Sequence, residues 1–347
     1  MNNIQTLNDK LVNFSDKDYP LGIFSGKMGL CIYFYYLSRW EKNEKYKYIA
    51  DKYLDDIFEQ SANYSDITVE YGLSGIGLGI SILIKENFIE GNINEILEDI
   101  DSIIFKRIAF LDYQKVQKRI SKTDLLYLLY YLYTRFTDCK YSDNQYIFQE
   151  LIIKVIEMLN EDMPSDFFND YFSFSIQNFH LPIFLYVIRK IYDLGIYNNR
   201  IIKILEEHSQ KILSTYPVST ANKIYYLCGL VNIKPCLPRF QKELELLIKQ
   251  IIKNIDMEYM FNSEFKEQDI FLENGLSMVY LLLLYLKNEY PEYCIEYTPS
   301  SFLDRLQSST AWTTLLDSKF YFRYNSQFMA GFPGTYLVMS YIKKQLS

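Results

Sequence analysis

Four glycines interrupt an apolar run in the stretch Tyr71-Gly72-Leu73-Ser74-Gly75-Ile76-Gly77-Leu78-Gly79-Ile80. Glycine inside a helix is unfavourable by roughly 1 kcal/mol relative to alanine, so glycines gathered at a helix start indicate a close approach of two backbones or a sharp turn. Similar glycine-containing openings precede three other apolar runs, at residues 22–29, 275–277 and 331–334. One structural unit, an apolar helix with a glycine-rich opening, is therefore used several times in this chain.

Apolar and amphipathic segments alternate along the whole chain. The starts of successive apolar segments lie about 45 to 60 residues apart, a spacing typical of helical hairpins. The seven apolar segments are residues 29–37, 75–84, 124–133, 179–192, 221–230, 275–286 and 331–342. The amphipathic segments, with apolar residues recurring at helical spacing, are residues 4–14, 46–60, 92–110, 144–160, 198–213, 240–255 and the short 301–307.

This alternation predicts the fold class. Helices that are apolar on all sides must be buried, and amphipathic helices must cover them. We therefore expect an all-α fold, an α/α toroid in which a ring of seven inner helices lies inside a ring of seven outer helices. No Pro- or Ser-rich linker divides residues 1–347, so we expect a single domain, with irregular excursions at residues 256–269 and 287–300.

The composition argues against several classes of function. The chain has 347 residues, 49% of them apolar, a formal net charge of −7 and scattered lysines, so we expect no nucleic-acid partner. None of the five cysteines forms a Cys-x-x-Cys pair, which argues against a disulfide framework and a ribbon-type zinc site. No signal peptide is visible, and the longest apolar runs are far shorter than the roughly 18 to 20 residues that span a bilayer. We expect a soluble cytoplasmic protein.

The glycine-punctuated inner helices carry a family resemblance. Together with residues 71–77 and the following Leu83-Ile84-Lys85-Glu86-Asn87-Phe88-Ile89-Glu90-Gly91, they closely resemble the lanthionine synthetase C-like family, the lantibiotic cyclases, over essentially the whole chain. The resemblance implies an α/α toroid. It also implies a cyclase activity that adds a peptide Cys thiolate to a dehydrated Ser or Thr, on a zinc ion held by two Cys and one His.

The three zinc ligands that the resemblance implies are absent from this chain. The family's Ser-Trp-Cys-Tyr-Gly motif, which opens the fifth inner helix, corresponds to residues 219–223, with Ala221 in place of Cys. The Cys-His-Gly motif, which opens the sixth, corresponds to residues 273–275, with Glu273 and Asn274 in place of Cys and His. Neither an alanine methyl group nor an asparagine amide is a credible tight zinc ligand. We expect these three residues to line the cavity without a metal or another cofactor.

Two other family positions are retained. Asp124, in Asp124-Leu125-Leu126, matches the opening of the third inner helix, and His180 matches the histidine ahead of the fourth. The resemblance implies that both face the central cavity as an acid/base pair. Helix capping is an equally good explanation for Asp124, and a structural role is the alternative for His180. A substitute metal site of Asp124, His180 and Glu273 is a weaker alternative, because the set is rich in oxygen and has one imidazole.

We interpret the chain as a degenerate member of this class that binds a peptide in its central cavity. It would act as an accessory protein in lanthipeptide-like biosynthesis, with a precursor peptide and a dehydratase as candidate partners. Two alternatives stay open. One is an active thioether-forming cyclase with an unusual metal or none. The other is an α/α-barrel glycoside hydrolase that uses Asp124 and Glu273, although the chain has only two tryptophans to serve as sugar platforms.

Overall fold

The computed structural model describes residues 2–12, 19–110, 121–139, 144–161, 165–168 and 172–347. Every regular element in these ranges is a helix. The chain divides into two compact units, Met1–Val155 with Thr310–Ser340 and Ile156–Ser309 with Tyr341–Ser347. No described helix combines the length and the hydrophobicity that a membrane span requires. The single domain over residues 1–347 stays a prediction.

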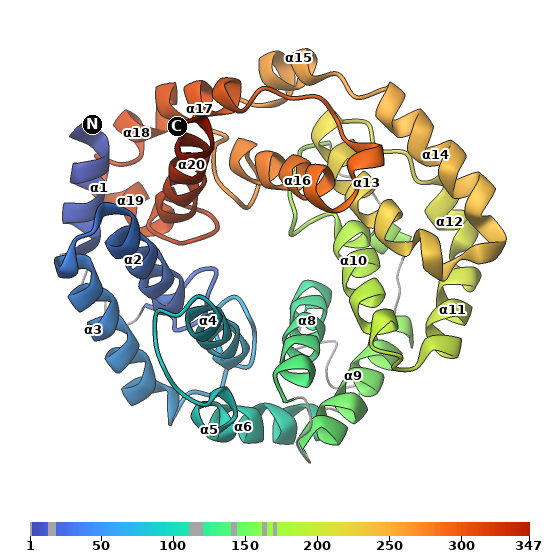
Figure 1. Ribbon diagram of the computed structural model, residues 1–347, viewed down its shortest axis with the longest axis horizontal. Helices are drawn as coiled ribbons and strands as arrows, with labels where there is room; N and C mark the ends of the chain where they lie inside the picture. The colour runs from blue at the N-terminus through green and yellow to red at the C-terminus, as the bar shows by residue number, and fades with distance from the viewer. Residues whose placement is uncertain (1, 13–18, 111–120, 140–143, 162–164, 169–171) are drawn as a thin grey trace. The chain divides into compact units, whose positions relative to one another are not determined.

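The first unit has a buried layer of apolar helices and a covering layer of amphipathic ones (Figure 1). The buried helices are α2 (Lys27–Glu41), α4 (Leu73–Lys85), α8 (Lys122–Asp138) and most of α20 (Phe332–Leu346). The covering helices are α1 (Asn2–Val12), α3 (Glu44–Ser61), α5 (Ile93–Ile96), α6 (Glu98–Ala109) and most of α9 (Asn144–Glu161). The short helices α18 (Ala311–Thr314) and α19 (Lys319–Asn325) precede α20. In the covering helix α6, for example, only Ile100, Ile104 and Ile108 are buried, at the helical spacing that the sequence shows.

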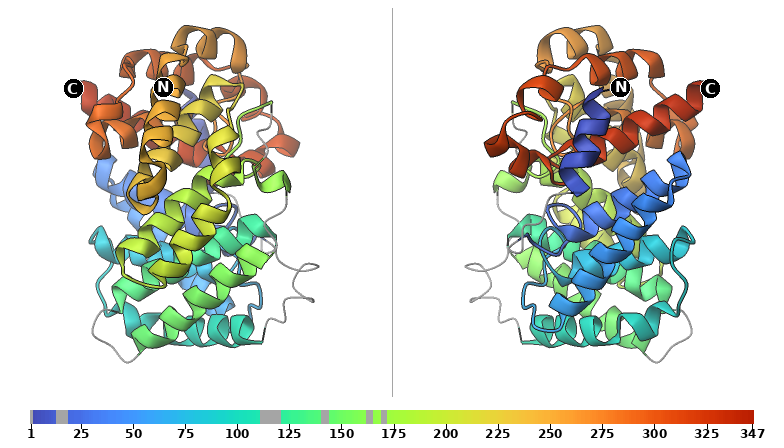
Figure 2. Two further views of the ribbon diagram at one scale, coloured as in Figure 1. Left: turned by 90° about the vertical axis from the view of Figure 1, so that its right-hand side faces the viewer. Right: turned by 90° about the vertical axis from the view of Figure 1, so that its left-hand side faces the viewer.

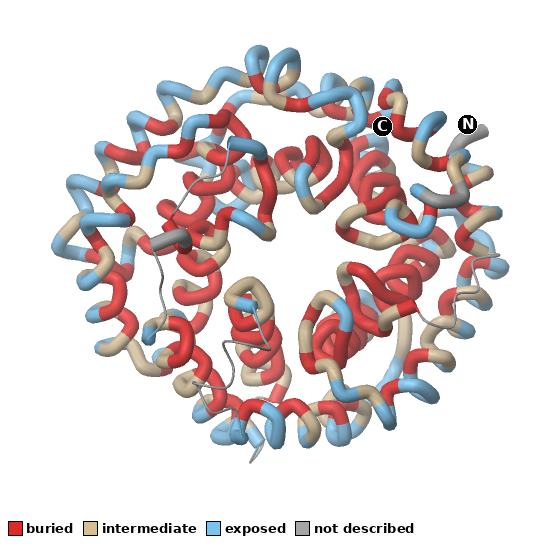
Figure 3. The backbone as a smooth tube through the Cα atoms, turned by 180° about the vertical axis from the view of Figure 1, so that it is seen from behind, coloured by how far each residue is buried: buried red, intermediate tan, exposed pale blue. Residues whose placement is uncertain are grey.

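The second unit repeats this arrangement. Its buried helices are α10 (His180–Asp193), α13 (Thr220–Ile233) and α16 (Leu276–Glu289). Its covering helices are α11 (Asn198–Glu207), α12 (Ser209–Ser214), α14 (Gln241–Lys253) and α17 (Pro299–Ser308). Figure 2 shows α11, α12 and α14 side by side on the outside of the unit. In both units the buried residues are concentrated on the apolar helices, as the red segments of Figure 3 show.

Short helical segments connect the longer helices of the second unit. They are the 3-10 helices η1 (Ser165–Phe168), η2 (Lys234–Cys236), η3 (Pro238–Phe240) and η5 (Pro291–Tyr293), the short α15 (Met257–Tyr259) and the π-helix η4 (Met260–Glu264). The last two lie within residues 256–269, which the sequence suggested to be irregular.

The predicted helical segments agree with the structure in position, with two differences. Residues 92–110 form two helices that meet at Leu97, and residues 198–213 form two that meet at His208. At both residues the backbone leaves the helical region, with φ near −97° and −98° and ψ of 3°. The ring of His208 packs on Phe168, with 5.4 Å between the centroids. The end of the predicted segment 4–14, at residues 13 and 14, lies outside the described residues.

At the glycine-rich openings, the loop that precedes each helix folds back over the start of that helix. In α2, α4 and α16 the first helical N–H donates to the carbonyl of the residue seven positions earlier. The pairs are Lys27 with Pro20 (2.8 Å), Leu73 with Asp66 (2.9 Å), and Leu276 with Asp269 (3.0 Å). The residue before each donor is a glycine, and a Cβ on Gly72 would collide with the same carbonyl oxygen of Asp66. The close backbone approach inferred from the glycines is therefore confirmed, and each loop caps its own helix.

Candidate functional site

Helix α13 begins at the position that the resemblance assigns to a zinc ligand. Ser219 is its N-cap residue, and the Ser219 hydroxyl accepts the N–H of Asn222 (3.2 Å). The N–H groups of Thr220 and Ala221 donate to the two carboxylate oxygens of Glu264, at 2.6 and 3.1 Å. Ala221 is completely buried, with 0% of its surface exposed. This helix start holds a carboxylate from its own chain, and Ala221 has no side-chain atom that could bind a metal.

Glu273 and Asn274 lie in the loop that precedes α16. Glu273 is half-buried and Asn274 is exposed. The carbonyl oxygen of Glu273 accepts the N–H of Ile176 (3.1 Å), so the segment before α10 packs against the loop before α16. The ring of Phe174 in that segment contacts the ring of Tyr225 on α13, with 6.2 Å between the ring centroids. The segment before α10 therefore contacts both the loop before α16 and helix α13 within the second unit.

His180 is the first residue of α10 in the same unit. It is half-buried, and its ring stacks on Phe167 with 5.9 Å between centroids and 19° between planes. An imidazole stacked on a phenyl ring has the packing of a structural histidine. Its proposed role as a cavity acid/base stays a prediction.

Asp124 belongs to the first unit and forms a capping box at the start of α8. Its carboxylate accepts from the backbone N–H of Ser121 (3.2 Å) and from the Ser121 hydroxyl (2.6 Å). In return the Ser121 hydroxyl accepts the N–H of Asp124 (3.1 Å). This reciprocal pair satisfies two helix-terminal donors and gives Asp124 a clear structural role. Because Asp124 and His180 lie in different units, their pairing stays a prediction.

Replacing Asp124 by alanine tests this structural role. We expect a loss of about 0.5–2 kcal/mol in the free energy of unfolding, measured by urea denaturation, because a helix cap is removed. Asp124→Asn retains an acceptor oxygen at the same place and should lose less. Equal stability of wild type and Asp124→Ala would contradict the capping role and favour a functional one.

The donor atoms do not fit a zinc ion. Within the described ranges, no three His, Cys, Asp or Glu side chains are grouped so that they could share a metal ion. Ala221 contributes a buried methyl group at one implied ligand position. Cys228, on the same helix, is buried, and desolvation raises the pKa of its thiol well above the usual value, which disfavours the thiolate that zinc requires.

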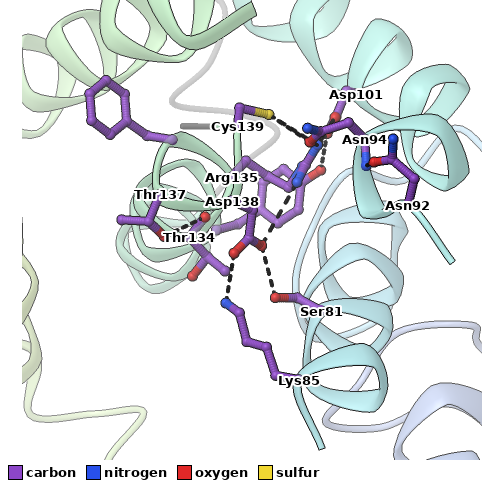
Figure 4. Close-up of polar contacts among 12 residues, drawn as sticks. Ser81, Lys85, Asn92, Asn94, Asp101, Thr134, Arg135, Thr137, Asp138 and Cys139 are labelled. Atoms are coloured by element: carbon purple, nitrogen blue, oxygen red, sulfur yellow. Dashed lines mark hydrogen bonds and ion pairs between the residues drawn. The ribbon is translucent and has the colours of Figure 1, made fainter. Parts of the chain in front are cut away.

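A buried charge network that was not predicted from the sequence lies in the first unit (Figure 4). Arg135 on α8 is 0% exposed, and its Nε and Nη2 donate to the Asp101 carboxylate of α6 at 3.1 and 2.8 Å. Its Nη2 also donates to Oδ1 of Asn94, at 3.0 Å. The Tyr131 hydroxyl donates to Asp101 as well, and burial raises the pKa of Tyr131 so that the phenol keeps its proton. The guanidinium thus fixes α5, α6 and α8 together.

Asp138 extends this network to α4. Its Oδ2 lies 3.8 Å from Nη1 of Arg135 and accepts a hydrogen bond from the Ser81 hydroxyl at 2.8 Å. Its Oδ1 pairs with Nζ of Lys85 at 2.7 Å. The sequence carried one signal: Arg135 continues the apolar face of segment 124–133, and an arginine on a buried face needs a carboxylate partner.

The two layers of helices, with loop-capped apolar helices beneath amphipathic ones, define an α/α toroid, and the predicted fold class is confirmed. Among solved structures, the chain is similar to nisin cyclase, with a TM-score of 0.63 and 12% sequence identity over 99% of this chain and 94% of that chain. No family model and no curated protein sequence matches the chain. At this level of identity, the similarity shows a shared fold.

Proposed function

We propose that this chain is a degenerate relative of the thioether-forming peptide cyclases that binds a peptide without zinc-dependent ring closure. The observation that supports this proposal most is the similarity to nisin cyclase over 99% of the chain, combined with a buried alanine at a zinc-ligand position. The protein would serve lanthipeptide-like biosynthesis as an accessory, with a precursor peptide as ligand and a dehydratase as a second partner.

The chemistry of the reaction explains why the missing ligands matter. A free thiol with a pKa near 8.5 is a few per cent thiolate at neutral pH, so incomplete deprotonation alone costs only about 2 kcal/mol. The larger loss concerns position, since a metal holds the sulfur at the alkene and an uncoordinated cysteine depends on peptide binding alone. A chain without the ligands can therefore keep peptide binding and lose efficient ring closure.

A dehydrated peptide with one cysteine tests the proposal. Thioether formation leaves the peptide mass unchanged, so remaining thiols are alkylated with N-ethylmaleimide and counted by mass spectrometry. We expect the purified protein to contain substoichiometric zinc and to leave the thiol count at the level of a protein-free control. Fluorescence anisotropy of the labelled peptide should still report saturable binding.

Each contrary outcome points to a different function. Protein-dependent loss of the thiol, with a thioether confirmed by fragmentation, would refute the degenerate interpretation and support an active cyclase. The absence of saturable binding to any dehydrated or unmodified precursor peptide would refute the peptide-binding role. Hydrolysis of a glycan panel, abolished in Asp124→Asn and Glu273→Gln, would support the glycoside hydrolase instead.

A further inference from the structure

Helix α13 begins differently from the three loop-capped helices α2, α4 and α16. In α2, α4 and α16, the first helical N–H is bound by a backbone carbonyl of the loop just before the helix. In α13 the first two N–H groups are bound by Glu264, which lies 44 and 43 residues further along the chain. A glycine precedes the helix in the three local cases, whereas Ser219 precedes α13. The cap of α13 is therefore a tertiary contact.

Glu264 and Ser219 together bind the first three helical N–H groups of α13. The first three helical N–H groups have no partner within a helix. Here the N–H groups of Thr220 and Ala221 are bound by the Glu264 carboxylate and that of Asn222 by the Ser219 hydroxyl. A carboxylate at a helix N-terminus makes charge-assisted hydrogen bonds and a favourable interaction with the helix dipole. No vacant donor is left among these three groups.

Glu264 is held in place by the segment that carries it. It is the last residue of the π-helix η4, a rare element that often occurs at functional positions. The carbonyl oxygen of Phe261 accepts from Nη2 of Arg305 on α17 (2.8 Å), and the Phe261 ring packs on Phe302 at 4.8 Å. Beyond Glu264, the Phe265 ring contacts Phe174 at 6.1 Å. The carboxylate is therefore positioned by contacts on both sides.

We propose that Glu264 replaces the metal as the link between the start of α13 and the segment that leads into α16. In the cyclases that this chain resembles, the zinc ligands come from the openings of the two corresponding helices, so the ion joins them. Here the donors at those openings do not fit a metal. The Glu264 carboxylate instead joins the start of α13 to η4, which lies ahead of the loop before α16, by two hydrogen bonds. The second unit is consequently stabilised without a metal, and its stability depends on Glu264.

Hydrogen exchange on the full-length protein tests this link. We compare the wild type, Glu264→Ala, Glu264→Gln and the control Glu267→Ala, whose exposed carboxylate belongs to the same segment. We expect the backbone amides of Thr220 and Ala221 and those of residues 257–265 to exchange about tenfold faster in Glu264→Ala, which corresponds to about 1.4 kcal/mol. Glu264→Gln keeps one acceptor and should be intermediate. Glu267→Ala and wild type treated with EDTA should exchange at the same rate as untreated wild type.

Three results would overturn the proposal. The first is an unchanged exchange rate at Thr220 and Ala221 in Glu264→Ala. The second is an equal acceleration in the control Glu267→Ala, and the third is an acceleration of wild type by EDTA, which would reveal a structural metal. If Glu264→Ala does not fold, Glu264→Gln decides, since wild-type exchange rates in that variant would refute the link. The proposal rests on the zinc-free part of the proposed function, but none of these readouts depends on a peptide, so failure of the link and failure of peptide binding are distinguishable.

Discussion

Replacing Arg135 by alanine is expected to lower the free energy of unfolding of this protein by about 3–5 kcal/mol, because breaking a buried ion pair leaves an uncompensated charge. Arg135 is fully buried and donates to Asp101 through two nitrogen atoms. Without it, Asp101 would keep the hydrogen bond from the Tyr131 hydroxyl but lose its cationic partner among the described residues, whereas Asp138 would still pair with Lys85. Urea denaturation followed by circular dichroism measures the loss.

Two further variants separate charge from packing. Arg107→Ala removes an exposed arginine from α6 and should change stability by no more than about 0.5 kcal/mol. Arg135→Met combined with Asp101→Asn removes both charges while keeping similar volumes, so it should be more stable than Arg135→Met alone. Equal losses in Arg135→Ala and Arg107→Ala would contradict a stabilising role for the buried network.

Replacing Gly72 by alanine is expected to have the second large effect. The added Cβ would meet the backbone carbonyl of Asp66, which cannot rotate away as a side chain does. Overpacking of this kind costs about 1–3 kcal/mol, and displacement of the loop would also break the 2.9 Å hydrogen bond from Leu73 to Asp66, a further 1 kcal/mol or so. The shift of the urea midpoint at an unchanged denaturant slope measures the combined loss.

Gly195→Ala is the matched control for this substitution. Gly195 has φ of +77°, and no neighbouring atom lies within 4 Å of a Cβ added there. Its replacement should therefore show only the strain of a left-handed backbone, about 1 kcal/mol. If Gly72→Ala were no worse than Gly195→Ala, the loop over the start of α4 would be free to move, and the explanation of the glycine pattern would be wrong.

The helices were predictable because their signal is local. The spacing of Ile100, Ile104 and Ile108 predicts one buried face on α6 independently of the rest of the chain. The glycine openings were predictable for the same reason, since Gly72 and its partner Asp66 lie in one loop. The breaks at Leu97 and His208 were not predicted, because neither position carries a proline or a glycine.

The contacts that define the candidate site were not predictable in this way. Glu264 reaches Ala221 across 43 residues, and Arg135 reaches Asp101 across 34, so no sequence window contains both partners. The resemblance drew attention to Ala221 through the residue type that is missing there. It gave no indication of the carboxylate that binds its N–H group, because Glu264 lies in a segment without helical periodicity.

The long separation between α13 and its cap bears on how the protein is made. As the chain leaves the ribosome, α2, α4 and α16 emerge with the carbonyl groups that close their first turns already present. The first turn of helix α13 can be capped only after Glu264, 44 residues beyond Thr220, has also been synthesised. A nascent chain that ends before Glu264 would expose a frayed first turn of α13 to proteases. The second unit would therefore complete its folding only after Glu264 had been translated.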